Sequence, residues 1–119
     1  MIVLVEDNPD QRLVLRLALE QAGYAVREAA SGAEALALLR ARASPIVITD
    51  IFMPDTDGME LAGTIMREFP GTKIVVMSGG SGRVGSTDYL AIARLIGVAA
   101  TFEKPFRMEA LLDTLARLR

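Results

Sequence analysis

The sequence of 119 residues contains neither cysteine nor histidine. The lack of cysteine excludes disulfide bonds, thiolate metal sites and thiol catalysis. The lack of histidine excludes Ser-His catalysis, imidazole metal ligands and a phosphohistidine on this chain. A metal site would therefore use oxygen ligands, which favour hard cations such as Mg²⁺ or Mn²⁺.

An excess of one charge is also lacking, because 13 basic and 15 acidic residues leave a net charge of −2. That balance is not typical of a nucleic-acid-binding protein. No apolar run approaches the roughly 20 residues of a membrane helix. The N-terminal MIVLVEDNPD lacks the basic start of a signal peptide. We expect a cytoplasmic domain that binds neither nucleic acid nor membrane.

Apolar residues are abundant, at 51% of the chain, which is enough for one hydrophobic core and a single domain over residues 1–119. Apolar patterns predict strands at 2–5, 25–29, 45–49, 73–78 and 99–103, and helices at 9–22, 31–42, 57–69, 87–97 and 107–119. This alternation indicates a doubly wound α/β fold with a parallel sheet. Five strands fit the order 2-1-3-4-5.

Local signals mark the ends of the first two predicted helices. Asn8 followed by Pro9 is typical of a helix start, and Gly23 of a helix end. Ser31 and Glu34 have the spacing of a capping box. Apolar residues share one face of the first helix (Leu13, Val14, Leu17) and the inward face of the last (Met108, Leu111, Leu112, Leu115).

Polar side chains stand at the ends of four predicted strands. Glu6 and Asp7 follow the first strand, and Asp50 follows the third. Ser78 ends the fourth strand, and Lys104 follows the fifth. Each residue alone is explained by a solvated loop or a helix cap. Ligands of such sheets bind beyond the carboxyl ends of the strands, so we expect all five side chains to lie together.

These five residues predict a phosphoryl-accepting site. Three carboxylates about 5 Å apart repel by roughly 3 kcal/mol per pair at an effective dielectric of about 20, so we expect a cation among them. Mg²⁺ commonly pairs with phosphate oxygens, whose remaining charge Lys104 and Ser78 would meet. A carboxylate in such surroundings can accept a phosphoryl group, and we interpret Asp50 as the nucleophile.

With these motifs the whole chain resembles the receiver domain of two-component response regulators, a CheY-like member of the flavodoxin-like folds. The motifs are Glu6-Asp7, Asp50 with Met53-Pro54 and Asp57-Gly58 downstream, Ser78, and Lys104-Pro105-Phe106. The resemblance implies that a sensor histidine kinase or phosphotransfer protein passes a phosphoryl group from its phosphohistidine to Asp50. Such a domain catalyses only its own phosphorylation and dephosphorylation.

The resemblance also implies a role for each site residue. Asp7 and Asp50 would bind Mg²⁺ directly, with Glu6 acting largely through water. The backbone carbonyl of Phe52 would complete the protein ligands. Lys104 would contact the phosphoryl group, and Ser78 would move toward it.

The sequence departs from the family at three places. Thr101 stands where receivers usually carry the aromatic switch residue, and Phe102 falls on a core position. Phe52 is bulky, and we expect it to hinder the hydrolytic water and to lengthen the phosphorylated lifetime. Residues 79–87 form a long glycine-rich link, either a tolerated insertion or a mobile segment that orders around phosphorylated Asp50.

Rival interpretations lack essential residues. Residues 80–87 resemble a phosphate-binding P-loop but carry Ser86 in place of its lysine. Residues 55–58 resemble a haloacid-dehalogenase motif, but the buried strand ends five residues earlier; an EF-hand would need acids at Met53 and Thr64. A flavin-binding module shares the topology but does not need the acidic cluster.

The output of the domain is left open by the sequence. The chain is either a stand-alone receiver or part of a longer regulator or hybrid kinase. The fourth helix is more apolar than one buried face requires, with Tyr89, Leu90, Ile92, Leu95 and Ile96. We expect a protein target to bind the face made by helix 4, strand 5 and helix 5.

Overall fold

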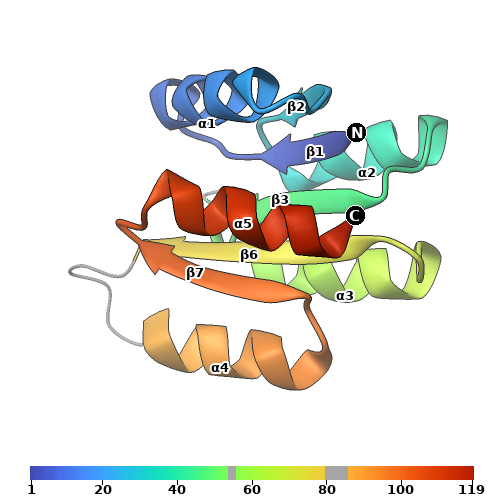
Figure 1. The fold of residues 1–119 in the computed structure, drawn as a ribbon. Coiled ribbons are helices and arrows are strands. Elements are labelled where there is room, and N and C mark those ends of the chain that lie inside the picture. The colour runs from blue at the N-terminus through green and yellow to red at the C-terminus, as the bar shows by residue number, and fades with distance from the viewer. Residues whose placement is uncertain (54–55, 80–85) are drawn as a thin grey trace.

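The computed structural model describes residues 1–53, 56–79 and 86–119, apart from the side chains of residues 56 and 86–89. The strands are β1 (Ile2–Val5), β2 (Val26–Ala29), β3 (Ile46–Asp50), β4 (Phe52–Met53), β5 (Thr56–Asp57), β6 (Lys73–Gly79) and β7 (Ala100–Lys104). The helices are α1 (Pro9–Gln21), α2 (Gly32–Ala41), α3 (Gly58–Glu68), α4 (Ser86–Ile96) and α5 (Met108–Leu118). Strands and helices alternate along the chain, except that β3, β4 and β5 follow one another (Figure 1).

Five parallel strands form one sheet in the order β2-β1-β3-β6-β7. The predicted α/β fold and its 2-1-3-4-5 order are confirmed, because β4 and β5 lie outside this sheet as a separate antiparallel pair. The sequence did not predict that pair, since two-residue strands are too short to show a periodicity. The buried β3 is central, whereas the less apolar β2 and β7 are the edges, as their compositions predict.

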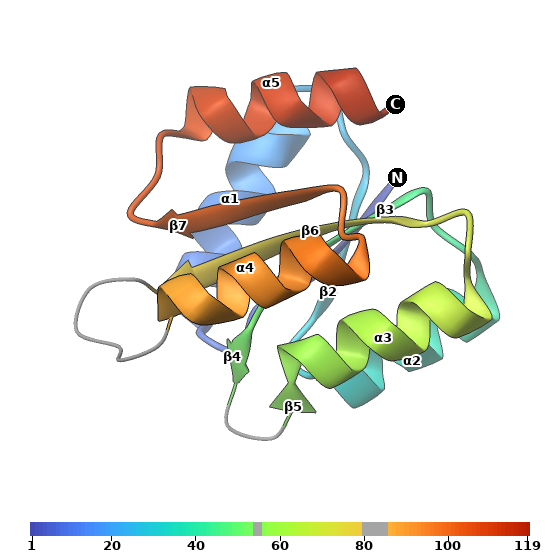
Figure 2. The same cartoon turned by 90° about the horizontal axis from the view of Figure 1, so that it is seen from below.

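Both faces of the sheet are covered by helices (Figure 2). Successive side chains of a strand point to opposite faces, so β1 supplies Val3 and Val5 to one core and Ile2 and Leu4 to the other. Residues of α2, α3 and α4 complete the first core, including Leu39, Ile65 and Ala93. Residues of α1 and α5 complete the second, including Leu19, Leu111 and Leu115.

Helix ends follow the local signals of the sequence. The Asn8 side chain accepts hydrogen bonds from the backbone N–H groups of Asp10 and Gln11, both at 3.0 Å, and Ser31 accepts one from Glu34 at 3.2 Å. Gly23 after α1 has φ +99°, which glycine adopts without the steric cost of a Cβ. The Asn8 cap sets the start of α1 directly after Glu6 and Asp7, which follow β1.

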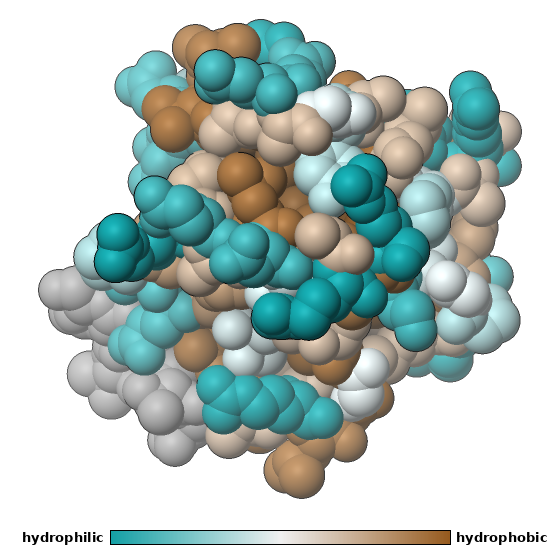
Figure 3. Space-filling model, viewed as in Figure 1, coloured by the Kyte–Doolittle hydropathy of each residue, from teal (hydrophilic) through white to brown (hydrophobic). Residues whose placement is uncertain are grey.

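The apolar face expected for α1 is not its buried face. Leu13, Val14 and Leu17 are 44%, 62% and 52% exposed, whereas Leu15 and Leu19 face the core. The helix carries two apolar stripes, and its packing against the sheet and α5 decides which one is buried. Figure 3 shows brown, hydrophobic surface over α1. None of the described helices has both the length and the apolar character to cross a membrane.

Candidate functional site

The carboxyl ends of the parallel strands bring the predicted site residues to one edge of the sheet (Figure 1). Glu6 and Asp7 directly follow β1, and Asp50 is the last residue of β3. Ser78 lies on β6, one residue before its end, and Lys104 is the last residue of β7. Residues nearly 100 positions apart in the sequence therefore meet, since Lys104 Nζ donates a hydrogen bond to Glu6 Oε2 at 3.3 Å.

Asp50 is buried, with 6% of its surface exposed, and both of its carboxylate oxygens are engaged. Its Oδ1 accepts a hydrogen bond from the backbone N–H of Phe52 at 3.1 Å. Its Oδ2 accepts one from Lys104 Nζ at 2.8 Å, which is also an ion pair. These contacts hold the carboxylate in one orientation at the end of a buried central strand.

Glu6 is more buried than Asp50, with 1% of its surface exposed. Its Oε1 accepts a hydrogen bond from the backbone N–H of Asn8 at 3.3 Å, and its Oε2 accepts from Lys104. Burial raises the pKa of the Glu6 carboxyl above its ordinary value of 4.5, and the charge of Asp50 adds to the rise, while Lys104 opposes it. A carboxylate in this environment costs energy to ionise unless a cation joins it.

Lys104 is the cation that the protein itself supplies. Burial alone would lower the pKa of its ammonium, but the hydrogen bonds and negative charges of Asp50 and Glu6 outweigh burial and raise that pKa above 10.5. Lys104 is therefore charged at neutral pH. The peptide bond from Lys104 to Pro105 is cis.

The three carboxylates can hold a metal ion together. One oxygen from each of Glu6, Asp7 and Asp50 lies within 4.8 Å of the others, and Asp7 is partly exposed. One ammonium cannot neutralise three carboxylates, so the cluster keeps an excess of negative charge. The donors are all oxygen, and the set fits a hard divalent cation.

Ser78 lies on β6, the strand that pairs with β3, where Asp50 is the last residue. Its side chain is fully buried, and its Oγ has no hydrogen-bond partner among the described residues. A buried hydroxyl without a partner is costly, on the order of 1–3 kcal/mol. A ligand with acceptor oxygens at the strand ends would satisfy it.

Thr101, which stands where receivers usually carry an aromatic residue, makes a polar contact. Thr101 Oγ1 accepts a hydrogen bond from Arg94 Nε at 2.9 Å, which joins β7 to α4. Phe102, the next residue, packs against the core beneath α1 and α5, with its ring 5.2 Å from that of Phe106. The side chain at position 101 is therefore tied to α4 in this state of the protein.

The sequence did not predict that Gln11 contacts Lys104. Its Oε1 accepts a hydrogen bond from Lys104 Nζ at 2.9 Å. The contact depends on the long Lys104 side chain reaching across the carboxyl ends of the strands to α1. No local pattern marks an exposed glutamine on a helix as part of a site.

Several expectations lie outside the described residues. These are the Pro54 part of the Met53-Pro54 motif, Asp55, residues 80–85 of the glycine-rich link, and the side chain of Tyr89. The P-loop-like segment 80–87 falls almost wholly within this set. Met53 and the Asp57-Gly58 pair are described, and Asp57 caps α3 by accepting a hydrogen bond from the backbone N–H of Met59 at 2.8 Å.

Comparisons with known proteins find relatives of this chain. A family model for the response regulator receiver domain matches residues 2–116. The transcriptional regulatory protein GlrR of Escherichia coli (strain K12) is 34% identical over 110 residues, which cover 92% of this chain and 24% of GlrR. The response regulator receiver protein CpdR of Brucella abortus (strain 2308) is 33% identical over 117 residues, which cover 98% of this chain and 94% of CpdR.

A solved structure has the same fold. The receiver domain of NtrX from Brucella abortus superposes with a TM-score of 0.90 at 28% identity, covering 99% of this chain and 97% of that one. The chain thus spans about a quarter of the length of a relative such as GlrR and nearly the whole of CpdR.

Proposed function

Because the chain belongs to the response regulator receiver domain family, we propose that Asp50 accepts a phosphoryl group from the phosphohistidine of a sensor histidine kinase or phosphotransfer protein. The observation that carries the proposal is the ion pair between the buried Asp50 and the partly buried Lys104, 2.8 Å apart, beside two further carboxylates. A nucleotide- or flavin-binding module does not need this cluster, so the cluster favours the phosphoacceptor. We take residues 1–119 as one receiver unit in the cytoplasm.

In the proposed transfer, a carboxylate oxygen of Asp50 attacks the phosphorus atom. The new O–P bond forms while the P–N bond to the donor imidazole breaks, and the electrons of that bond leave with the imidazole nitrogen. Lys104 already contacts Asp50, so its ammonium is placed to neutralise charge on the phosphoryl oxygens. The hydroxyl of Ser78, which has no hydrogen-bond partner in the described part of the chain, supplies a hydrogen-bond donor for the same group.

The proposed metal is Mg²⁺, with Mn²⁺ as a substitute. Asp7 and Asp50 would hold it directly, with Glu6 through water and the backbone carbonyl of Phe52 as a further ligand. A divalent ion here supplies positive charge that offsets the carboxylates and the phosphoryl oxygens. The charge of the ion would also offset the cost of ionising the buried Glu6 carboxyl, whose pKa burial raises.

The proposed output is a change in protein contacts. The face of α4, β7 and α5 exposes Leu95 at 85%, and Ile92 and Ile96 at more than 40%. The Arg94–Thr101 hydrogen bond lies within this face and connects two of its elements. We propose that this face binds a protein target. The length of GlrR leaves open that the target is another domain of a longer chain.

The test is phosphorylation by a small acyl phosphate, followed by intact mass measurement. The wild type with Mg²⁺ is expected to gain the mass of one phosphoryl group. Asp50→Asn, and wild type with a chelator, are expected to gain none. If wild type that binds Mg²⁺ gains no mass, the proposal is wrong, and the domain signals through binding alone.

A further inference from the structure

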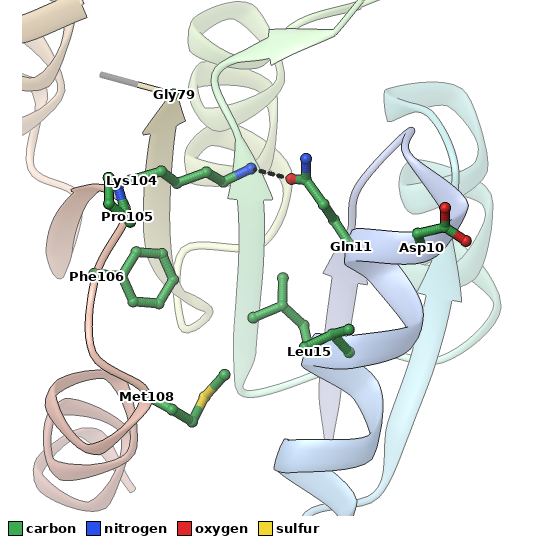
Figure 4. A pocket seen from close by; sticks show the side chains of 9 residues that line it. Asp10, Gln11, Leu15, Gly79, Lys104, Pro105, Phe106 and Met108 are labelled. Atoms are coloured by element: carbon green, nitrogen blue, oxygen red, sulfur yellow. Dashed lines mark hydrogen bonds between the residues drawn. The ribbon is translucent and has the colours of Figure 1, made fainter. Parts of the chain in front are cut away.

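A groove of about 640 Å³ separates α1 from the connection between β7 and α5. Its walls are mostly apolar, with Val14 and Leu15 on one side and Phe106 and Met108 on the other. Figure 3 shows brown surface at the bottom of this hollow. Lys104 and Gln11 meet across one end of the groove, as the dashed line in Figure 4 shows.

The Lys104 ammonium has three N–H donors, and three acceptors surround it. They are Asp50 Oδ2 at 2.8 Å, Gln11 Oε1 at 2.9 Å and Glu6 Oε2 at 3.3 Å. Two of these acceptors belong to the carboxylate cluster. Gln11 is the neutral one, and it comes from α1 rather than from a strand end.

The two carboxylate contacts cannot stay unchanged when the site is used. A divalent ion bound at the cluster would attract the oxygens of Glu6 and Asp50 and repel the ammonium. A phosphoryl group on Asp50 would compete with that carboxylate for the lysine. The amide of Gln11 carries no charge and lies outside the cluster. Neither metal binding nor phosphorylation of Asp50 would oppose the contact between Gln11 and Lys104.

We propose that Gln11 is a positioning residue for Lys104, which keeps the ammonium at the mouth of the site while the two carboxylates exchange partners. The inference rests on the proposed phosphoacceptor function. Ordinarily an exposed glutamine on a helix is solvated. Here its side chain extends toward the lysine, whose stem crosses from β7 to meet it (Figure 4).

The first test compares three variants in phosphorylation by a small acyl phosphate with Mg²⁺. Gln11→Leu keeps the size of the side chain but removes the acceptor, whereas Gln11→Glu keeps an acceptor at the same reach. Gln21→Leu, near the other end of the same helix, is the matched control. Thermal unfolding of all variants checks that the fold is retained.

We expect Gln11→Leu to raise the donor concentration for half-maximal rate about five-fold, because a loosely held lysine binds the incoming phosphoryl oxygens less well. The maximal rate should change less than about two-fold. Gln11→Glu should restore the wild-type value within about two-fold, and Gln21→Leu should not change it. Wild-type behaviour of Gln11→Leu would overturn the inference.

The second test needs neither metal nor donor. The sequence holds two lysines, Lys73 and Lys104, and Lys73 is exposed, so it serves as an internal reference in ¹⁵N NMR of the side-chain ammonium groups. Protons of Lys104 should exchange more slowly than those of Lys73 in the wild type, and Gln11→Leu should remove much of that difference. Two results would contradict a positioning role. One is that Lys104 protons exchange as slowly in Gln11→Leu as in the wild type. The other is that, within the wild type, Lys104 protons exchange as fast as those of Lys73.

The two tests also separate this inference from the proposed function. If the wild type accepts no phosphoryl group, the proposed function fails. The NMR comparison then still decides whether Gln11 holds Lys104.

Discussion

Glu6 is nearly fully buried and stands beside two other carboxylates, so its ionisation state matters for stability. Its folded pKa is raised above 4.5, the ordinary value that we take for the unfolded chain. The folded state therefore binds the proton more tightly than the unfolded state does. The resulting stabilisation is fully present below pH 4.5 and is lost as pH rises through the raised pKa.

Glu6→Gln removes this ionisation and keeps the shape of the side chain. Without metal, we expect the variant to have a higher free energy of unfolding than the wild type at neutral pH, and no such advantage below pH 4.5. Urea unfolding in a chelator at both pH values measures the difference. A variant that is less stable than the wild type at neutral pH would mean that the ion pair with Lys104 outweighs the burial of the carboxylate.

Gly58 stands where the chain leaves the site and enters α3. A Cβ at this position would lie 2.5 Å from the backbone oxygen of Asp50 and 2.5 Å from the Cα of Ile51. Both atoms belong to backbone that cannot move without disturbing Asp50. Gly58→Ala should therefore lower the free energy of unfolding by roughly 3 kcal/mol.

Gly63 is the matched control for that substitution, because it lies in the same helix and its added Cβ would meet only the flexible end of Arg67, at 3.7 Å. Gly63→Ala should raise the free energy of unfolding by roughly 0.5–1 kcal/mol, since alanine favours a helix. Chemical denaturation measures both variants. Equal effects at the two glycines would refute the steric explanation.

Phe52 is half-buried, and its backbone N–H donates to Asp50 Oδ1. We expect its side chain to hinder the water that would hydrolyse phosphorylated Asp50. Phe52→Asn should shorten the phosphorylated lifetime by a few-fold, because a smaller polar side chain admits water. Intact mass followed over time after removal of the donor gives the lifetime. An unchanged dephosphorylation rate in Phe52→Asn would contradict the hypothesis that Phe52 hinders water.

At the scale of elements, α1 and α4 expose apolar residues at different places. Val14 on α1 is 62% exposed and lines the groove that ends at Lys104. Leu95 on α4 is 85% exposed, but it lies near the end of α4 that is remote from the carboxyl ends of the strands (Figure 1). A donor protein must reach Asp50, so we expect it to contact α1 and not this end of α4.

Two serine substitutions separate these faces. We expect Val14→Ser to slow transfer from an autophosphorylated sensor kinase by about five-fold or more, through lost apolar contact, while transfer from a small acyl phosphate is retained. Leu95→Ser should leave both transfers unchanged. The donor is the kinase that phosphorylates the wild type fastest in a tested panel. An equal loss of transfer rate in Val14→Ser and Leu95→Ser would argue against α1 as the docking element.

At the scale of the whole molecule, the site draws on β1, β3, β6, β7 and α1, so binding there should stabilise the entire fold. The unfolded chain does not hold the three carboxylates together. At about 100 times the dissociation constant, a ligand of the folded state adds roughly 2.7 kcal/mol to the free energy of unfolding.

Saturating Mg²⁺ should therefore raise the midpoint of thermal unfolding by roughly 10 °C. The rise should vanish with a chelator. It should also be small in Asp7→Asn, which removes one negative charge from the exposed side of the cluster. A rise of the same size in that variant would show that Mg²⁺ binds elsewhere.

The five long strands, the five helices, the order of the main sheet and the proximity of Glu6, Asp7, Asp50 and Lys104 followed from local pattern. Apolar periodicity is a property of neighbouring residues, and strand ends of a parallel sheet meet at one edge whatever the details of packing. The helix caps at Asn8 and Ser31 were equally local. For these features the amino-acid sequence was sufficient.

Other features were decided by packing. Leu15 and Leu19, not Leu13 and Leu17, became the buried face of α1, because the sheet and α5 lie on that side. The Gln11–Lys104 contact joins residues 93 positions apart, and Arg94 reaches Thr101 only because α4 packs beside β7. Such contacts depend on distances between elements that no stretch of sequence encodes on its own, so the tertiary structure alone settled them.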